Sequence, residues 1–195
     1  MNSNNPFRKH FIALAAPSGG GKTTLCRKLL QKYPQACLSI SFTTRKPRGA
    51  ERNGVDYHFV DEAEFQKLIQ ENAFIEWAKV HGNYYGTSRV FLEEQCSQGK
   101  LVLLDVDVQG VDSLKEAFGA RCLSVFVLPP SMLELEKRLR ARQTESEEKL
   151  QVRLQNARDE MERAKDFDYR VVNHDLNESF AELCSIVEKE VGIAK

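Results

Sequence analysis

A lysine and two threonines follow three consecutive glycines in FIALAAPSGGGKTT, which runs from residue 11 to residue 24. Glycine adopts backbone angles closed to other residues, so several N–H groups can converge on one anion. A helix beginning near Lys22 would add its unpaired N–H groups and the positive end of its dipole. Lys22 would reach the β- and γ-phosphates of a nucleotide, and the Thr23 hydroxyl would be a ligand of the accompanying Mg²⁺.

This stretch matches the pattern G-x-x-x-x-G-K-[ST] except at its first position, which is Ala16. A glycine-rich turn with a chance Lys-Thr is the alternative, but a strand before it and a helix after it favour a phosphate loop. The residues expected to hold the nucleotide phosphates are Ala16, Pro17, Ser18, Gly19, Gly20, Gly21, Lys22, Thr23 and Thr24.

Two arginines and two tyrosines form a second group of side chains suited to an anion: Arg45, Arg48, Tyr57 and Tyr85. Arginine offers a planar fork that matches phosphate oxygens, and tyrosine hydroxyls add directional donors. An isolated R-x-x-R is more often a solvated basic turn. The flanking pattern favours a second phosphate site instead.

Glu76 stands among large apolar side chains in the sequence Phe74-Ile75-Glu76-Trp77. A carboxylate in such a setting usually has a specific partner, because burying a charge unpaired is costly. The Watson–Crick edge of guanine presents two adjacent N–H donors that one carboxylate can accept, and adenine does not. A surface glutamate on an edge strand is the alternative.

Two further carboxylates, Asp105 and Asp107, interrupt the apolar run KLVLLDVDVQ over residues 100–109. The run is typical of a buried parallel strand, and alternation along a strand predicts both carboxylates on one face. They lie near its C-terminal end, where open α/β sheets bind ligands.

Arginines also mark residues 131–165. A helix begins at Ser131 and carries Arg138, Arg140 and Arg142, and a capping box at Thr144 predicts a second helix to about Lys165 with Arg153 and Arg158. Because the two helices are polar and short of large apolar residues, we expect them to bury little area and to form a mobile lid.

Between these groups the chain alternates apolar strands with amphipathic helices, which indicates an α/β fold with a mostly parallel, doubly wound sheet. Strands are expected at 37–42, 55–60, 74–80, 100–109, 122–128 and 169–172, and a turn at 83–86. We interpret the 195 residues as a single domain. Its core covers about 7–40, 97–130 and 166–195, with an insert at about 41–96 and a lid at about 131–165.

The composition limits the class of protein. Twenty-eight basic and 28 acidic residues give a formal net charge of zero, which does not favour nucleic acid or an anionic membrane. Five widely spaced cysteines without C-x-x-C pairs argue against a disulfide framework or a zinc site, and they suit a reducing compartment. With no signal peptide or membrane span expected, we predict a cytoplasmic protein.

Five ordered motifs behind the phosphate loop resemble the guanylate kinase (GMP kinase) family, of the bacterial type: SFTTRKPRGAE, NGVDYHFV, FIEWAKVHGNYYGTS, LLDVDVQG and RLRARQTESEE. The resemblance covers nearly the whole chain. It implies a P-loop nucleoside-triphosphate fold with a GMP-binding insert and a helical lid. It also implies an enzyme that transfers the γ-phosphoryl of ATP to GMP, and to dGMP, giving ADP and GDP with Mg²⁺.

The resemblance implies a role for each matching position. The GMP phosphate would be held by Arg45, Arg48, Tyr57 and Tyr85, and guanine would be read by Ser41, Glu76, Thr87 and Asp105. Asp107 matches an acidic position near Mg²⁺ and its waters, and Asn173 an adenine-side contact. The catalytic cations would be Lys22, Arg45 and the lid arginines Arg138, Arg142 and Arg153.

Two residues depart from the family pattern, and two other functions are compatible with the same fold. Ala16 replaces the first loop glycine, and Gln143 stands where the family often has glycine after a lid arginine. A non-catalytic guanylate-kinase-like protein-binding module would share the fold, although such modules typically lack an intact phosphate loop or lid arginines. A kinase of the same fold acting on a phosphorylated sugar is the other alternative. The sequence leaves the oligomeric state open, a homo-oligomer included.

Overall fold

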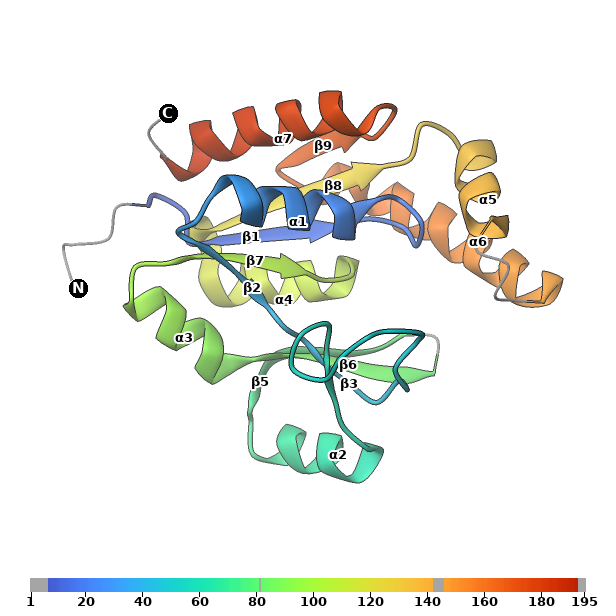
Figure 1. The fold of residues 1–195 in the computed structure, drawn as a ribbon. Helices are drawn as coiled ribbons and strands as arrows, with labels where there is room; N and C mark the ends of the chain where they lie inside the picture. The colour runs from blue at the N-terminus through green and yellow to red at the C-terminus, as the bar shows by residue number, and fades with distance from the viewer. Residues whose placement is uncertain (1–6, 81, 142–145, 193–195) are drawn as a thin grey trace.

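Five parallel strands form the central sheet, in the order β2-β7-β1-β8-β9. The computed structural model describes residues 7–80, 82–141 and 146–192. The strands are β1 (Phe11–Ala15), β2 (Ala36–Ser39), β7 (Leu101–Asp105), β8 (Cys122–Leu128) and β9 (Tyr169–Val172). The predicted mostly parallel α/β sheet is therefore confirmed, and β1 lies at its centre between β7 and β8 (Figure 1).

Helices cover both faces of this sheet. One face packs under α1 (Lys22–Lys32) and α7 (Leu176–Val191), the other under α3 (Arg89–Ser97) and α4 (Val108–Phe118) (Figure 1). Successive β1 residues point to opposite faces, so Ile12 joins the first core while Phe11 and Ala13 join the second. Burial on both faces explains why the strands read as unbroken apolar runs.

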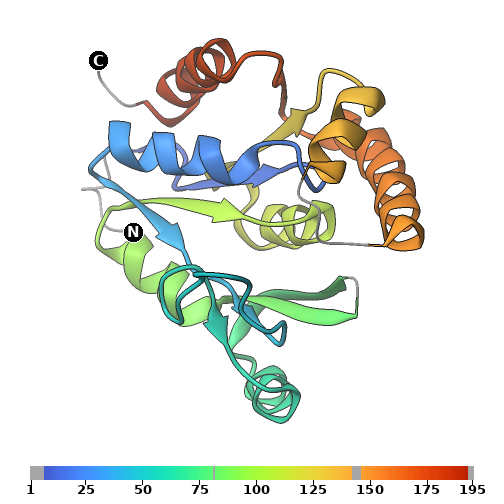
Figure 2. The same cartoon turned by 45° about the vertical axis from the view of Figure 1, so that its right-hand side comes forward.

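A second sheet, in the order β4-β3-β6-β5, lies beside the central one (Figure 2). Its strands are β3 (Phe42–Thr43), β4 (His58–Phe59), β5 (Phe74–Val80) and β6 (Asn83–Ser88), with α2 (Glu62–Gln70) following β4. The strand expected at 37–42 is divided between the two sheets, and only 58–59 of the strand expected at 55–60 forms. The turn expected at 83–86 is wrong, because these residues pair with β5 as a strand.

The expectation that Asp105 and Asp107 share one strand face is also wrong. β7 ends at Asp105, and Asp107 is the N-cap of α4, where its Oδ1 accepts the N–H of Gly110 at 2.8 Å. Aspartate is favoured at this position because its short carboxylate satisfies a helix N–H that has no partner within the helix. The chain therefore turns from strand to helix between the two carboxylates.

The predicted lid consists of α5 (Met132–Arg140) and α6 (Glu147–Glu162). Ser131 caps α5 as predicted, accepting the N–H of Glu134 at 3.2 Å. The predicted cap Thr144 lies outside the described residues, as do Arg142 and Gln143. The two helices bury more than expected, since they share a small core of their own made of Leu135, Leu139, Leu150, Leu154 and Ala157.

Short 3₁₀ turns complete the chain at Gly119–Arg121 and Arg163–Asp166. All five cysteines, each within the described part of the chain, are free thiols. Cys26 belongs to α1 and Cys184 to α7, and both are buried where these helices pack on the sheet, whereas Cys122 is buried on the face that packs against α4. Within the described ranges, no helix has the length and apolar character needed to cross a bilayer.

Candidate active site

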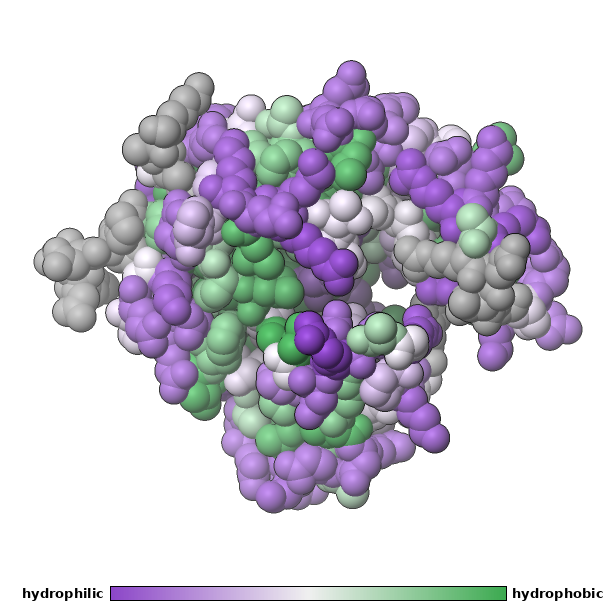
Figure 3. Space-filling model, viewed as in Figure 1, coloured by the Kyte–Doolittle hydropathy of each residue, from purple (hydrophilic) through white to green (hydrophobic). Residues whose placement is uncertain are grey.

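A cavity of about 820 Å³ opens where β1 and β7 end, between the central sheet, the second sheet and α6. Figure 3 shows the molecule hollowed in this region. Sequence segments far apart in the chain form its wall. Of the predicted site residues, those in the wall are Ala16, Pro17, Ser18, Gly19, Gly20, Gly21, Lys22, Thr23, Thr24, Ser41, Arg45, Arg48, Tyr57, Glu76, Tyr85, Asp105, Asp107 and Arg153.

The phosphate loop joins β1 to α1 along one side of the cavity. Gly19 and Gly21 have φ of +91° and +95°, a region that favours glycine. The N–H of Gly20 donates to the carbonyl of Pro17 at 2.8 Å, which closes the turn. Gly21 is the N-cap of α1 and supplies no side chain to cap it, so the first N–H groups of α1 remain available at the cavity wall.

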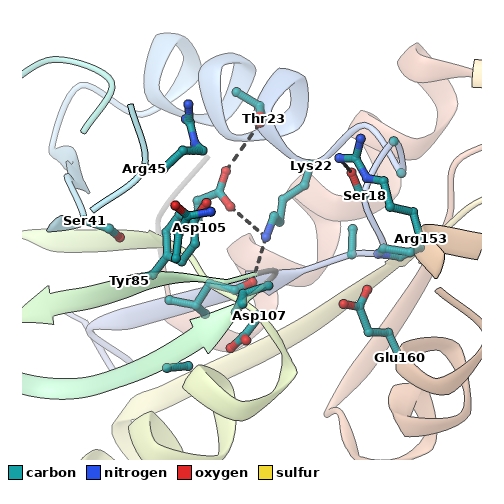
Figure 4. Close-up of a pocket in the computed structure, with 18 of the residues that line it drawn as sticks. Ser18, Lys22, Thr23, Ser41, Arg45, Tyr85, Asp105, Asp107, Arg153 and Glu160 are labelled. Carbon is teal, nitrogen blue, oxygen red and sulfur yellow. Dashed lines mark hydrogen bonds and ion pairs between the residues drawn. The ribbon is translucent and has the colours of Figure 1, made fainter. Parts of the chain in front are cut away.

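Lys22 extends from the first turn of α1 into the cavity. Its Nζ pairs with Asp105 Oδ1 at 2.7 Å and donates to the carbonyl of Val106 at 2.7 Å (Figure 4). Burial alone would lower the pKa of Lys22, but attraction and hydrogen bonding to Asp105 raise it above its ordinary value. The lysine is therefore held in its charged form, and the Thr23 hydroxyl contacts the other Asp105 oxygen at 3.4 Å.

The oxygen atoms at this end suit a hard cation that binds mainly through substrate oxygens. They come from the Thr23 hydroxyl and the Asp105 and Asp107 carboxylates, all in the cavity wall. Among the described residues, no group of three or more His, Cys, Asp or Glu side chains is arranged to hold a metal alone. Such a donor set fits Mg²⁺, which usually keeps several waters and uses one or two carboxylates together with phosphates.

Glu76 and Thr87 come from the paired strands β5 and β6 on the opposite side. The Thr87 hydroxyl donates to Glu76 Oε1, and Thr87 is buried behind the wall. Burial raises the pKa of Glu76 to about 7, with the Thr87 hydrogen bond opposing this effect and the negative charge of Asp107 adding to it. Glu76 therefore places a half-buried carboxylate oxygen at the cavity.

The basic cluster of the insert is built around Arg45, whose side chain is 9% exposed. The carbon at the centre of its guanidinium lies 5.1 Å from the centre of the Tyr57 ring, and the Tyr57 and Tyr85 rings are 6.1 Å apart. Glu51, which the sequence reasoning missed, accepts from both Nη atoms of Arg45 at 2.9 and 3.0 Å. Burial opposes the charge on Arg45, but the Glu51 carboxylate raises the Arg45 pKa.

The lid contacts the phosphate loop directly. Arg153 Nη2 donates to the Ser18 hydroxyl at 2.6 Å (Figure 4). Arg138 and Asn173 lie outside the described cavity wall, where Arg138 Nη2 donates to the Asn173 carbonyl at 3.3 Å. The Asn173 amide in turn donates to the carbonyl of Gly20 at 2.9 Å, so Asn173 contacts the loop directly and Arg138 is linked to the loop through Asn173.

Several acidic and lid residues in the wall were missed by sequence reasoning: Glu51, Glu148, Lys149 and Glu160. Burial raises the pKa of Glu160 to about 7, with Lys22 opposing this effect and Asp107 adding to it. Helical spacing could have found Glu160, because it lies seven residues, about two turns, after Arg153 on the same face of α6. No local sequence signal distinguishes Glu51 from other surface glutamates.

Comparison with known proteins gives one consistent family. A family model described as guanylate kinase matches residues 8–190. The chain is 48% identical over 176 residues to the guanylate kinase of Aromatoleum aromaticum. This alignment covers 90% of the chain and 86% of that relative. It is 50% identical over 180 residues to the guanylate kinase of Anaeromyxobacter dehalogenans, covering 92% of this chain and 80% of that relative.

Solved structures agree with this result. A crystal structure of guanylate kinase from Anaplasma phagocytophilum matches with a TM-score of 0.78 and 34% identity, covering 93% of this chain and 86% of that chain. A crystal structure of shikimate kinase from Bacteroides thetaiotaomicron matches with a TM-score of 0.51 and 16% identity. The match covers 91% of this chain and 98% of that chain. The second likeness concerns the fold alone.

Proposed function

The chain belongs to the guanylate kinase family, and from that premise we propose how its cavity transfers the γ-phosphoryl of ATP to GMP, giving ADP and GDP. The observation that carries the proposal is the placement of the phosphate loop and of Glu76 on opposite sides of one 820 Å³ cavity. One side suits a triphosphate, and the other suits guanine. We expect dGMP to be accepted as well.

On the donor side, we propose that residues 16–24 hold the ATP phosphates, chiefly through backbone N–H groups of the loop and of the first turn of α1. Lys22 would exchange its bonds to Asp105 and the Val106 carbonyl for phosphate oxygens. Arg153, already bonded to Ser18 of the loop, lies where it can add a second positive charge. Arg138 and Asn173 would act by supporting the loop from behind, and Arg142 is proposed for the same phosphates from its sequence match alone.

On the acceptor side, we propose that Arg45, Arg48, Tyr57 and Tyr85 hold the GMP phosphate. Glu76 would accept the two adjacent N–H donors of guanine, and its bond from Thr87 fixes the carboxylate for that task. Ser41 and Asp105 line the same wall and would complete the contacts to the base.

The chemical step then needs no strong general base, because the nucleophile is an oxygen of a phosphate that is already anionic. Catalysis would come from in-line positioning and from neutralising charge at the transferring group. Lys22 and the lid arginines would supply protein charge, and the lid would exclude water that would otherwise hydrolyse ATP. Thr23 and Asp107 would hold Mg²⁺ on the protein side, Asp107 through water, and the bound ion would help to neutralise the phosphate charge.

We also propose an organisation and a setting. The chain would work as one domain, with a core at about 7–40, 97–130 and 166–195, a GMP-binding insert at about 41–96 and a lid at about 131–165. The even balance of charge and the five free thiols favour work in a reducing cytoplasm on small-molecule substrates.

A coupled assay of ADP release tests the proposal with GMP, dGMP, AMP and a sugar phosphate as acceptors. We expect turnover with GMP and dGMP and little with the other two. Lys22→Ala should lower kcat by at least about a hundredfold, because one charge that stabilises the transition state is lost. Preference for the sugar phosphate, or normal activity of a folded Lys22→Ala enzyme, would contradict the proposed acceptor site or phosphate loop, respectively.

A further inference from the structure

The guanidinium of Arg45 is held by a carboxylate of its own loop. Arg45 Nη1 and Nη2 each donate to one oxygen of Glu51, and Nη1 also donates to the Lys46 carbonyl at 2.8 Å. Glu51 Oε2 also accepts the backbone N–H of Arg48 at 2.7 Å. One carboxylate therefore joins both arginines of the basic cluster and closes the loop between them.

Counting the donors of Arg45 shows which edge Glu51 leaves for another anion. A guanidinium carries five N–H groups in one plane, and these three bonds use both on Nη1 and one on Nη2. The Nε–H and the second Nη2–H share the other edge of the plane, where they form a second fork. The Tyr85 hydroxyl lies beside the guanidinium and adds to the rise in its pKa.

We infer that Glu51 is a positioning residue for the acceptor phosphate, acting through Arg45. It holds one edge of the guanidinium so that the second fork meets the phosphate already oriented, and it fixes the Arg48 backbone in the same step. The entropy of ordering a long arginine side chain is then lost on folding and not on binding. This inference rests on the acceptor-phosphate site proposed above.

Glu51 could also weaken GMP binding by electrostatic repulsion, which predicts the opposite change on mutation. A carboxylate in the wall of an anion site repels the phosphate, so removing its charge would tighten GMP binding if repulsion dominated. Positioning dominates if the loss of the second carboxylate oxygen misplaces the fork. Glutamine in place of Glu51 has nearly the same shape, but its amide nitrogen donates and cannot accept from Arg45.

Calorimetric titration of the full chain with GMP and with guanosine separates these effects, because guanosine lacks the phosphate. We expect Glu51→Gln to weaken GMP binding about tenfold, the scale of a misplaced binding group, and to leave guanosine binding unchanged. The double variant with Arg45→Ala should lose GMP affinity by clearly less than the sum of the two single losses. Glu71→Gln, an exposed glutamate after α2, is the matched control and should change neither affinity.

Unchanged or tighter GMP binding by Glu51→Gln, or an equal loss for guanosine, would overturn the role of Glu51. Additive losses in the double variant would do the same, since Glu51 would then act independently of Arg45. If Arg45→Ala itself leaves GMP affinity unchanged, the acceptor-phosphate site is at fault instead. Should Glu51→Gln not fold, Glu51→Asp keeps the charge but shortens the side chain, and it undergoes the same comparison.

Discussion

Glu76 combines two properties that oppose each other at the scale of one residue. Its carboxylate is half-buried and bonded to Thr87, and burial raises its pKa to about 7. The desolvation that makes the charge costly also strengthens any hydrogen bond that it accepts from a ligand. The unfavourable free energy of burying the Glu76 charge would be offset by the hydrogen bonds that the proposed guanine donates to it.

Glu76→Gln should therefore lower kcat/KM for GMP by at least about tenfold while leaving KM for ATP nearly unchanged. An amide oxygen can accept, but the amide nitrogen cannot, so one of the two guanine donors loses its partner. Steady-state kinetics with each substrate varied in turn provides the measurement. Equal losses for GMP and ATP would point to a general distortion of the cavity.

At the scale of elements, the phosphate loop depends on a neighbouring strand end. A Cβ built on Gly21 would lie 2.3 Å from the amide nitrogen of Asn173, which follows β9. That amide donates to the Gly20 carbonyl. A methyl group at Gly21 would therefore clash with the amide and break the hydrogen bond that holds the loop.

Gly21→Ala should accordingly destabilise the protein by about 1–3 kcal/mol and raise KM for ATP, since it adds backbone strain at φ +95° and displaces Asn173. Gly54→Ala is the matched control, because Gly54 has φ +73° with open space around it. Denaturant unfolding and ATP kinetics on both variants separate strain from displacement. Equal effects would mean that the contact with Asn173 is unimportant.

The lid has a small core of its own, so its order can be changed without replacing any side chain proposed to act on the substrates. Leu154→Ala removes a buried side chain between α5 and α6 and should cost the lid about 2–3 kcal/mol of local stability. We expect faster amide exchange in α5 and α6, unchanged exchange in the central sheet, and a lower kcat. Leu133→Ala, on an exposed α5 position that is 65% accessible, should leave all three unchanged.

Helices and strands were predictable from sequence where a single pattern, such as an apolar run, extended over the whole segment. The strands β1, β8 and β9 and the start of α1 followed from apolar runs and from the glycine loop. The divided strand at 37–42 could not be predicted, because its two halves pair with partners far apart in sequence. Asp107 was misplaced since an aspartate two residues after a strand carboxylate fits both a strand face and a helix cap.

At the scale of the whole molecule, most of the residues proposed for the donor and for the acceptor come from different sheets that face one cavity, with Asp105 of the central sheet as the exception. Residue types predicted most of the wall, because phosphate and guanine each demand recognisable side chains. Glu51 was missed because its bonds to Arg45 form only when the loop folds, whereas Glu160 was missed although its helical spacing from Arg153 could have indicated it. Family resemblance likewise named Arg138 and Asn173 without revealing that Asn173 bonds to the loop and that Arg138 bonds to Asn173.

The buried charge of Glu76 also affects global stability. Its folded-state pKa is raised from 4.5 to about 7, so the protonated form is favoured in the folded state. Below about pH 4.5 the carboxyl is protonated and burying it carries no charge penalty. As the pH rises towards 7 and above, the folded protein must bury a charge and loses stability relative to the unfolded chain. Relative to wild type, Glu76→Gln should gain up to about 3 kcal/mol at pH 8 and little at pH 4.5, by denaturant titration. A difference that does not vary with pH would contradict this origin.

The three buried thiols lie on both faces of the central sheet. Burial raises the pKa of Cys122 to about 12 and raises that of Cys26 as well, so neither reacts readily while its face stays covered. Cys26 and Cys184 are on the buried faces of α1 and α7, whereas Cys122 lies on the sheet face under α4. Alkylation of each thiol, resolved by mass, would thus time the opening of each layer separately, and the native chain already carries the labels for such an experiment.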